Sequence, residues 1–492
     1  MRSRVVFYAF FIGMLFSSAS SANTFADENF IKAVRDMDAN GIVASLKEGA
    51  DINARDSRGN TALIITASKR LFRRYEADNI LNISKFLIDK GADVNARNAQ
   101  GNTALMYAAR IGHEDTVKLL VKEGADVNAR NSEGLSVLMH AASDENAGIT
   151  KFLVKKGADV SATHHGYGSA LLIALNKANL DAARFLISKK ADVNVSDDNG
   201  ITPLMVIAKT DHVAMLKLLI KSGADVNAQD KQGQTALVHA LTAYKFYENN
   251  INFLLEQNPD LNLQDINGLS ALMVAIQKNR AEVVKPLLAK GADPNMQDNT
   301  GKTALMHAIE LGHTNFINPL VAHQADLNLQ TKDGHTALMM ALSNSDTTAA
   351  KQLIDKGADI NVSNQKGMTP LMIAAQERLV DAVKYLVEKG ADLNKKNKAG
   401  NTALMVASDV GQMEIVNLLI EQQQDKLDLQ NQAGHTALMR ASFAGNMEVV
   451  KLLIKRGANP QLRDKNGLTA AMAANSQNNH DIVEYLRSLK NR

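Results

Sequence analysis

One short phrase recurs along this 492-residue chain and constrains its fold more than any other feature. In its clearest copy, at residues 101–109, the phrase reads Gly-Asn-Thr-Ala-Leu-Met-Tyr-Ala-Ala. Each copy opens on Thr or Ser, all but the last carry Leu two residues later, and most carry Met next. The opening residues are Thr61, Thr103, Ser136, Ser169, Thr202, Thr235, Ser270, Thr303, Thr336, Thr369, Thr402, Thr436 and Thr469.

The spacing of the copies is nearly constant. Successive openers are 42, 33, 33, 33, 33, 35, 33, 33, 33, 33, 34 and 33 residues apart. A fixed period of this size is typical of stacked repeats, in which each unit buries its apolar face against its neighbours. The sequence therefore predicts a repeat stack and not a set of separate globular domains.

The copy that opens at Thr103 shows the expected anatomy of one unit. The Thr103 hydroxyl is well suited to cap a short helix that ends near Arg110. A second helix follows, with Val117 and Leu120 on one face. Gly124 suits the left-handed residue that ends a helix. Each unit is thus predicted to be a helix–turn–helix with an extended turn into the next unit.

The consensus Gly-x-Thr-Ala-Leu-Met-x-Ala, followed by Gly-Ala-Asp-Val-Asn-Ala, resembles the ankyrin repeat over about residues 27–492. The resemblance implies an all-α repeat solenoid of helix–turn–helix units joined by β-turns, with about 14 units including an atypical first one. It also implies protein binding through the concave face and the β-turn tips. This chain departs from the family pattern by placing Met after the Leu in ten of thirteen phrases, where ankyrin repeats usually carry His.

The first 22 residues resemble a secretory signal peptide. Arg2 and Arg4 give a positive start, a run of twelve almost entirely apolar residues follows, and small residues allow cleavage after Ala22 or Ala19. A transmembrane anchor is disfavoured because a span needs about 18 or more apolar residues. We therefore expect a bacterial-type protein that is exported to the periplasm or secreted, with no membrane span in the mature chain.

The remaining boundaries follow from the repeat. An end unit must show one polar face to water, so the first and last units should differ from the internal ones. We expect an atypical N-terminal capping repeat at 23–56, the ankyrin-repeat array at 57–463 and a C-terminal capping repeat at 464–492.

Charge and motif content exclude several classes of function. The net charge is +3, and removal of Arg2 and Arg4 leaves 3 − 2 = +1, so no broad field attracts nucleic acid or anionic membrane. The chain has no Cys, which excludes disulfides, thiol nucleophiles and Cys-ligated metals. It also lacks the hydrolase, zinc-protease, phosphate-loop and EF-hand motifs. The sequence predicts no enzyme activity, no cofactor and no metal.

Copies that differ from the consensus are the candidate contact sites. Nine extra residues fall between the two helices of the unit that opens at Thr61, around 68–80. This basic and aromatic insertion could contact an acidic partner or a phosphate, or it could be a solvated turn. Its candidate binding residues are Arg70, Phe72, Arg73, Arg74 and Tyr75.

Two further candidates lie at turns. Tyr244, Phe246 and Tyr247 cluster in a unit with two extra residues, and could form a contact patch or cover neighbouring helices. The other turn carries His164, His165 and Tyr167. Two adjacent histidines could bind a metal, but no acidic residue or further His stands at ligand spacing nearby.

Two residue types recur at fixed positions of the phrase. His140, His239 and His307 share one position in non-adjacent copies, too far apart for one metal site, and should be partly buried or lie on the concave face. The methionines could sense oxidation or bind metal, but their strict register favours packing between first helices. They are Met106, Met139, Met205, Met273, Met306, Met339, Met372, Met405, Met439 and Met472.

The sequence thus predicts a non-enzymatic, exported protein-binding scaffold. The turn tips are polar and uncharged overall, so they single out neither a footprint nor a partner. Two alternatives stay open: a structural spacer or self-associating envelope protein, and a secreted host-directed effector that binds in the same way. The oligomeric state also stays open.

Overall fold

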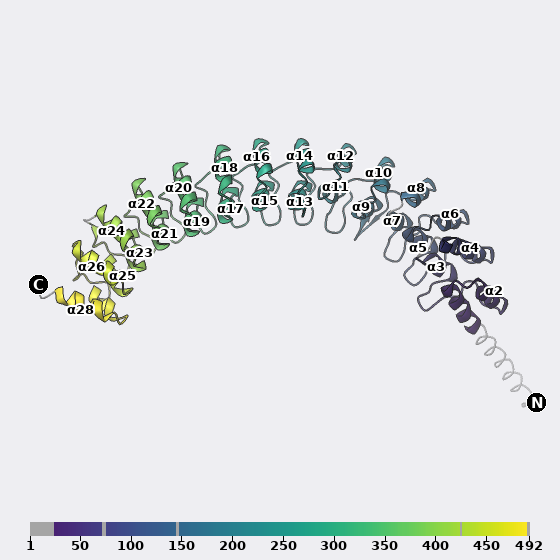
Figure 1. The fold of residues 1–492 in the computed structure, drawn as a ribbon, viewed down its shortest axis with the longest axis horizontal. Coiled ribbons are helices and arrows are strands. Elements are labelled where there is room, and N and C mark those ends of the chain that lie inside the picture. Colours follow the sequence, from purple (N-terminus) through teal and green to yellow (C-terminus); the bar gives the residue numbers. More distant parts are fainter. Residues whose placement is uncertain (1–23, 71–74, 144–146, 424–425, 490–492) are drawn as a thin grey trace, which may run out of the picture. The chain divides into compact units, whose positions relative to one another are not determined.

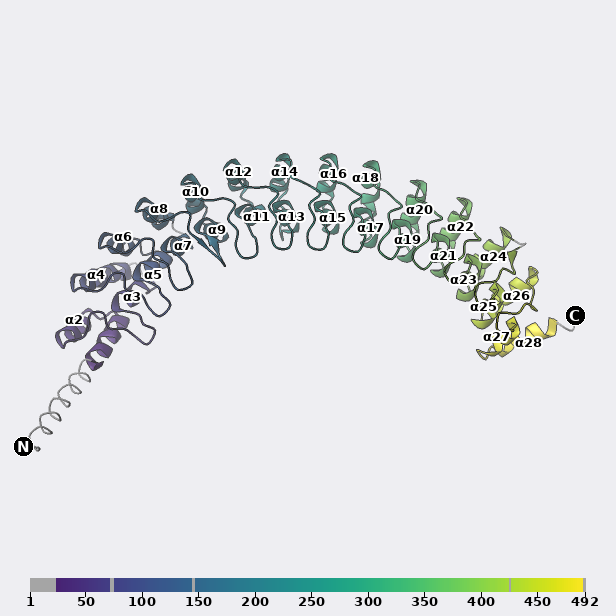
Figure 2. The same cartoon turned by 180° about the vertical axis from the view of Figure 1, so that it is seen from behind.

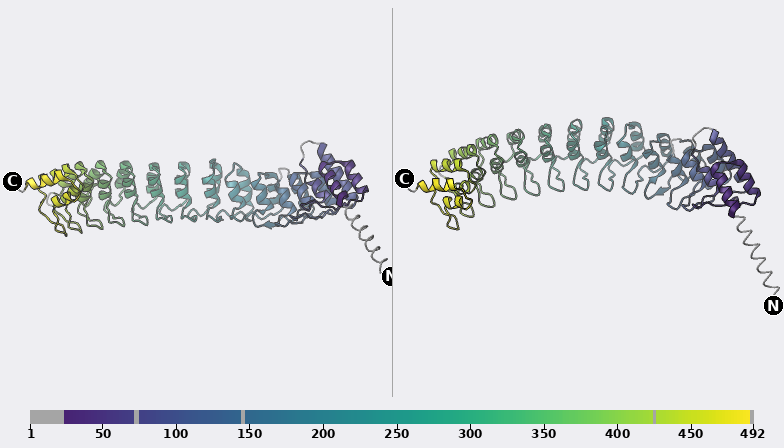
Figure 3. Two further views of the ribbon diagram at one scale, coloured as in Figure 1. Left: turned by 90° about the horizontal axis from the view of Figure 1, so that it is seen from below. Right: turned by 60° about the horizontal axis from the view of Figure 1, so that its bottom comes forward.

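The computed structural model describes residues 24–70, 75–143, 147–423 and 426–489. The chain forms two compact units, Met1–Gln257 (the N-terminal unit) and Asn258–Arg492 (the C-terminal unit). Within each unit the first helices of the repeats lie in a row beside the turns, and the second helices lie in a row behind them (Figure 1, Figure 2). In each unit the turns project from the side of the first helices (Figure 3). The predicted all-α repeat solenoid is confirmed.

The N-terminal unit contains six first helices that follow the repeated phrase. These are α3 (Ala62–Ala67), α5 (Ala104–Ile111), α7 (Val137–Ala142), α9 (Ala170–Asn176), α11 (Pro203–Ala208) and α13 (Ala236–Thr242). The second helices are α2 (Ala39–Lys47), α4 (Tyr75–Asp89), α6 (Glu114–Lys122), α8 (Ala147–Lys155), α10 (Leu180–Ser188), α12 (Val213–Lys221) and α14 (Glu248–Glu256). A two-stranded antiparallel hairpin, β1 (Thr163–His164) and β2 (Gly168–Ser169), precedes α9.

The C-terminal unit repeats the same plan. Its first helices are α15 (Ala271–Gln277), α17 (Ala304–Glu310), α19 (Ala337–Ser343), α21 (Pro370–Gln376), α23 (Ala403–Val410), α25 (Ala437–Phe443) and α27 (Ala470–Asn475). Its second helices are α16 (Ala281–Ala289), the 3-10 turn η1 (Thr314–Phe316) with α18 (Ile317–Ala322), α20 (Thr347–Asp355), α22 (Val380–Glu388), α24 (Met413–Glu421), α26 (Met447–Lys455) and α28 (His480–Ser488).

The repeated Thr or Ser caps the first helix, as predicted. In twelve of the thirteen phrases its hydroxyl accepts a hydrogen bond from the backbone N–H three residues later, at 3.2–3.5 Å. The exception is Thr469, which makes no such bond. Each cap satisfies one of the amides that the first turn of a helix leaves free.

The methionine stripe packs between first helices, as the register predicted. Nine of the ten side chains, from Met106 to Met439, are at most 3% exposed. Met472 is the exception at 47%. In the earlier repeats, the first helix of the next repeat packs against this position, as α25 does against α23. An unbranched side chain fills such a gap well.

In mild peroxide, these methionines should therefore be oxidised at different rates. We expect Met472 and Met413, which are 47% and 50% exposed, to form sulfoxide first, while the nine buried side chains resist as long as the stack is folded. Peptide mass spectrometry over a time course measures each rate. Oxidation of the nine at the rate of Met472, with no fall in the melting temperature, would contradict their burial.

Polar side chains at the turns tie each repeat to the next. Asn95 donates from Nδ2 to the carbonyl of Gly124 at 3.0 Å and accepts from the N–H of Asp126 at 2.8 Å. In the C-terminal unit Gln297 donates to the carbonyls of Gly301, at 2.7 Å, and Gln330, at 2.9 Å. These bonds satisfy turn carbonyls that no regular secondary structure would satisfy.

A buried side-chain amide also caps the C-terminal end of the first helix in the preceding repeat. Asn250 is 1% exposed, and its Nδ2 donates to the carbonyls of Ile207, Ala208 and Thr210 at 3.4, 3.2 and 2.5 Å. The last carbonyls of a helix have no partner within that helix, so α11 depends on this side chain.

Replacement of Asn250 by Leu should lower the free energy of unfolding by about 2 kcal/mol, because buried carbonyls lose their donor while the side-chain volume is kept. The neighbouring Asn249 is exposed, so N249A is the matched control and should change stability by less than about 0.5 kcal/mol. Urea denaturation followed by circular dichroism measures both variants. Equal effects of the two would show that the amide does not stabilise this junction.

Candidate binding surface

The exposed side chains of the first helices, together with the turn tips that precede them, form what we call the first-helix surface. The repeated phrase buries the Leu and Met of each first helix. The seventh and eighth residues after the opener lie at the end of the first helix and are mostly accessible to solvent. These positions vary between copies, so they can distinguish one part of the stack from another.

One depression on this surface of the N-terminal unit is the Tyr107 depression, of about 410 Å³. It lies beside two turn tips and is lined mainly by polar groups, which include Arg58, Asn60, Asn98 and Tyr107. Asn98 is 8% exposed, and its Nδ2 donates to Asn60 Oδ1 at 2.8 Å and to the Tyr107 hydroxyl at 3.2 Å. These bonds hold the Tyr107 ring at the edge of the depression.

The second is the His140 depression, of about 390 Å³. Residues of α5, α7 and α9 and the tip between β1 and β2 line it. Arg110 and Lys177 bring two positive charges, and the apolar side chains come from the turn tip and the two later helices. The apolar lining consists of Leu135, Met139, Ile173 and the ring of Tyr167.

Arg110 connects the two depressions. Its guanidinium lies 5.0 Å from the centre of the Tyr107 ring, a cation–π contact, and it also lines the His140 depression. Among the described residues, no carboxylate forms an ion pair with Arg110 or with Lys177. Two cations of the C-terminal unit do have carboxylate partners, since Lys302 pairs with Glu310 at 2.7 Å and Arg440 with Asp409 at 2.5 Å.

His140 is neutral at physiological pH. Burial, together with the nearby charge of Arg110, lowers its pKa from 6.5 to about 4. Its Nε2 is buried without a hydrogen-bond partner. The imidazole therefore adds no charge of its own to the depression, and the positive charge comes from the two cations.

The two other histidines at this position of the phrase are held differently. Nε2 of His239 lies 2.8 Å from Asp230 Oδ2, and Nε2 of His307 lies 3.0 Å from Asp298 Oδ2. Burial lowers both pKa values, and the aspartates oppose that shift. The residue at the Asp position before His140 is Asn131, which donates to another turn instead. With Asn131 at this position, the described lining of the His140 depression contains no carboxylate. As the sequence predicted, the three histidines are partly or fully buried.

Charge at the seventh and eighth positions after the opener differs between the units. In the N-terminal unit these positions hold four cations and one anion, 4 − 1 = +3, and in the C-terminal unit one cation and three anions, 1 − 3 = −2. The residues are Lys69, Arg110, Asp144, Lys177 and Lys209 in the first case and Lys278, Glu310, Glu377 and Asp409 in the second. The near-zero net charge of the chain hides this difference.

The hairpin tip places one predicted site residue in the His140 depression. Tyr167, 56% exposed, lines it, and its ring centre lies 5.2 Å from that of His164. The Tyr167 N–H donates to His164 Nδ1 at 3.2 Å, and His165 is exposed. In the described part of the chain, no three His, Asp or Glu side chains are grouped so that they could hold a metal ion.

The predicted aromatic cluster of Tyr244, Phe246 and Tyr247 is not part of the described lining of either depression. Tyr244 is fully exposed and Phe246 is half-buried, while Tyr247 has the ammonium of Lys245 5.6 Å from its ring centre.

The insertion differs from its prediction. We expected all nine extra residues between the helices, but α4 begins at Tyr75 and has fifteen residues where other second helices have nine, so 15 − 9 = 6 of them lengthen that helix. Arg70 is exposed. Phe72, Arg73, Arg74 and the side chain of Tyr75 lie outside the described residues.

Sequence reasoning missed Arg110, Lys177 and Tyr107 as members of one surface. The signal was available at the seventh and eighth positions, where the charges could be compared copy by copy. The insertions and turn tips depart more visibly from the consensus than these charges do.

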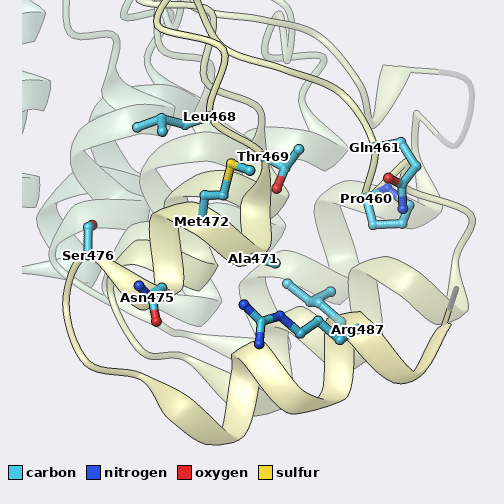
Figure 4. Close-up of a pocket in the computed structure, with 10 residues that line it drawn as sticks. Pro460, Gln461, Leu468, Thr469, Ala471, Met472, Asn475, Ser476 and Arg487 are labelled. Carbon is cyan, nitrogen blue, oxygen red and sulfur yellow. The ribbon is translucent and has the colours of Figure 1, made fainter.

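A third depression, of about 340 Å³, lies in the last described repeat (Figure 4). The side chains of Leu468 and Met472, 39% and 47% exposed, lie at its wall, and Arg487 of α28 contributes its charged end (Figure 4). The equivalents of Met472 in earlier repeats are buried by the next repeat. Separately, none of the described helices combines the length and apolar character that a bilayer span requires.

The sequence matches a known protein family. A family model described as ankyrin repeats (three copies) matches overlapping segments that together span residues 30–491. The segments are 30–131, 76–164, 123–197, 170–265, 241–331, 272–364, 315–397, 338–431 and 404–491. No curated protein matches the chain.

Proposed function

Because the chain belongs to the ankyrin repeat family, we propose that it is an exported, non-enzymatic scaffold that binds a protein through its first-helix surface. Ankyrin repeats generally mediate protein–protein interaction. One observation supports the proposal most. The core positions of the copies are nearly uniform and buried, whereas the positions that face solvent on the first helices differ between copies. A rigid frame that presents varied side chains suits specific binding.

Export is part of the proposal and rests on the first 22 residues, which have the charged, apolar and small-residue segments of a signal peptide. N-terminal sequencing of the protein from its native cells tests this part. A mature chain that begins after Ala22 or Ala19 is the expected result. A chain that keeps Arg2 and Arg4 would contradict export by this route.

Site-specific photo-crosslinking in the native compartment tests the binding function. A photoreactive phenylalanine replaces Tyr167 on the first-helix surface or, as the control, Phe185 on α10 of the same repeat, in the second-helix row. Both positions carry an aromatic ring, and the Phe185 ring is half-buried beside Lys189, at 5.6 Å.

We expect a specific partner protein to crosslink from position 167 and not from position 185. Crosslinks only between copies of the chain would instead support a self-associating spacer. Equal crosslinking from both positions, or none from position 167, would contradict binding through the first-helix surface.

A further inference from the structure

We propose that the His140 depression binds an acidic side chain of the partner, an Asp or Glu that sits next to apolar residues in its sequence. This inference rests on the proposed function and specifies the chemistry of its partner. It follows from the charge, the lining and the size of the depression, which are argued in turn.

Charge is the first argument. Arg110 and Lys177 line the same depression, and neither is paired with a carboxylate of the described chain. In the C-terminal unit, Lys302, just before its opener, and Arg440, four residues after its opener, have carboxylate partners at 2.7 and 2.5 Å. Lys278, at the same place of the phrase as Lys177, forms no ion pair with a described carboxylate. Within the described part of the chain, Arg110 and Lys177 thus have no carboxylate partner, and a carboxylate from outside could take that place. A guanidinium and an ammonium beside one another offer strong donors for it.

No described carboxylate lines the His140 depression. The phrase positions an Asp beside His239 and beside His307, but Asn131 stands at that position before His140. Asp144 and Glu145 follow Ser143 in sequence and lie outside the described residues, so they enter the experiment below and not the argument from geometry.

The apolar lining is the second argument. Met139, Ile173 and the ring of Tyr167 are among the residues that line the depression. A bare anion would leave these groups without a contact, whereas an acidic residue flanked by an apolar one would cover them. A volume of about 390 Å³ corresponds to roughly a dozen water molecules, which is room for one or two side chains.

Size and net charge favour a protein segment over a nucleic acid. A nucleic-acid site typically neutralises about six to ten phosphates. The His140 depression offers two cations, and the mature chain is predicted to carry a net charge of only +1, from 3 − 2. A polyanion is thus the competing occupant that the experiment must distinguish.

The experiment selects ligands for the full chain from a library of random short peptides and measures the affinity of the tightest peptide. A second peptide has each Asp or Glu replaced by its amide. The test variant is R110Q/K177Q, and the matched control is K302Q/E310Q, which removes a surface ion pair of the C-terminal unit. Heparin and a single-stranded oligonucleotide are the polyanion probes. Circular dichroism melting confirms that each variant folds.

We expect the selected peptides to carry Asp or Glu beside apolar residues. R110Q/K177Q should weaken binding at least about tenfold, the ratio expected from the loss of one charge-assisted hydrogen bond, and K302Q/E310Q should change it less than about twofold. The amide peptide should lose affinity to wild type by a similar factor. D144N/E145Q should tighten binding of the acidic peptide at low salt. This change removes two negative charges that directly follow Ser143, a lining residue of the depression, and that would repel an acidic ligand.

Several results would overturn the proposal. These are peptides without acidic residues, equal affinity of R110Q/K177Q and wild type, no peptide binding at all, or tighter binding of heparin or the oligonucleotide than of any peptide. If crosslinking from position 167 captures a partner while one of these results holds, the chemistry assigned to the depression fails and the binding function stands. If that crosslink is also absent, the function itself fails.

Discussion

Replacement of Gly334 by Ala should lower the free energy of unfolding by about 3 kcal/mol, whereas the same change at Gly357 should lower it by about 1 kcal/mol. Both glycines have a left-handed backbone, with φ of +81° and +94°. An Ala side chain is strained in that region at either site, and the gain from a less flexible unfolded chain offsets part of the strain. The backbone strain and the unfolded-state effect are therefore common to both variants, and they cancel when the two losses in free energy of unfolding are compared.

The difference comes from the next repeat. A Cβ on Gly334 would lie 2.6 Å from the backbone nitrogen of Gln365, whereas a Cβ on Gly357 meets no atom within 4 Å. The N–H of Gln365 donates to the carbonyl of Asp333 at 3.0 Å, so the clash would force apart a hydrogen bond between consecutive repeats. Backbone cannot move aside as a flexible side chain can.

Urea denaturation of G334A and G357A, followed by far-ultraviolet circular dichroism because the chain has no Trp, measures both losses. Because stability in a repeat stack is approximately a sum of unit and interface terms, hydrogen exchange should also place the loss in G334A at the two repeats that meet there. Equal losses for G334A and G357A would show that the turns of consecutive repeats do not approach as closely as described.

Acidification from pH 6.5 to pH 4 should cost the fold roughly 2 to 3 kcal/mol through His140 alone. Burial, with Arg110, lowers the pKa of His140 to about 4, while the unfolded chain has the ordinary value of 6.5. Between these values the unfolded state binds a proton that the folded state does not. Stability is therefore complete above pH 6.5 and is lost as the pH falls towards 4. Solvent that reaches the half-buried ring reduces the full difference, which is why the lower figure is included.

Urea denaturation of wild type and H140Q at several pH values between 7 and 4.5 isolates this contribution. H140Q should lose less stability than wild type on acidification, and R110Q should fall between them, because it removes the smaller, electrostatic cause and keeps the burial. Burial also lowers the pKa values of His113, His239 and His307. Wild type and variants therefore share a further loss of stability on acidification, which does not affect the comparison between them. Parallel pH profiles of wild type and H140Q would contradict the burial of this imidazole.

The repeated part of the fold was predictable because the same capping and core residues recur in one unit after another. The capping Thr or Ser, the buried Leu and the packed Met follow from side-chain chemistry and spacing within about ten residues. The last described repeat was less predictable. Thr469 makes no cap bond and Met472 is exposed although both match the phrase, because burial depends on the repeat that follows.

The candidate site was predictable only in part, for a different reason. Tyr167 stood out as a departure from the consensus and does line the His140 depression. Arg110 and Lys177 occupy ordinary positions of ordinary copies, and what distinguishes them is that both line one depression, which depends on how the repeats pack. The insertion misled because its extra residues could extend a helix as well as a loop, and six of them do, since 15 − 9 = 6.

The central claim is that residues which differ between copies on the first-helix surface of the N-terminal unit bind the partner, while the repeated core only supports them. The variant R110D/K177E tests it directly, because it gives these positions the residues Asp409 and Glu377 that the C-terminal unit carries at the same places of the phrase. Proteins crosslinked to this variant and to wild type in the native compartment are quantified by mass spectrometry. We predict an unchanged melting temperature, within a few degrees, and loss of the partner. Recovery of the same partner in equal amount from a folded R110D/K177E chain would contradict the claim.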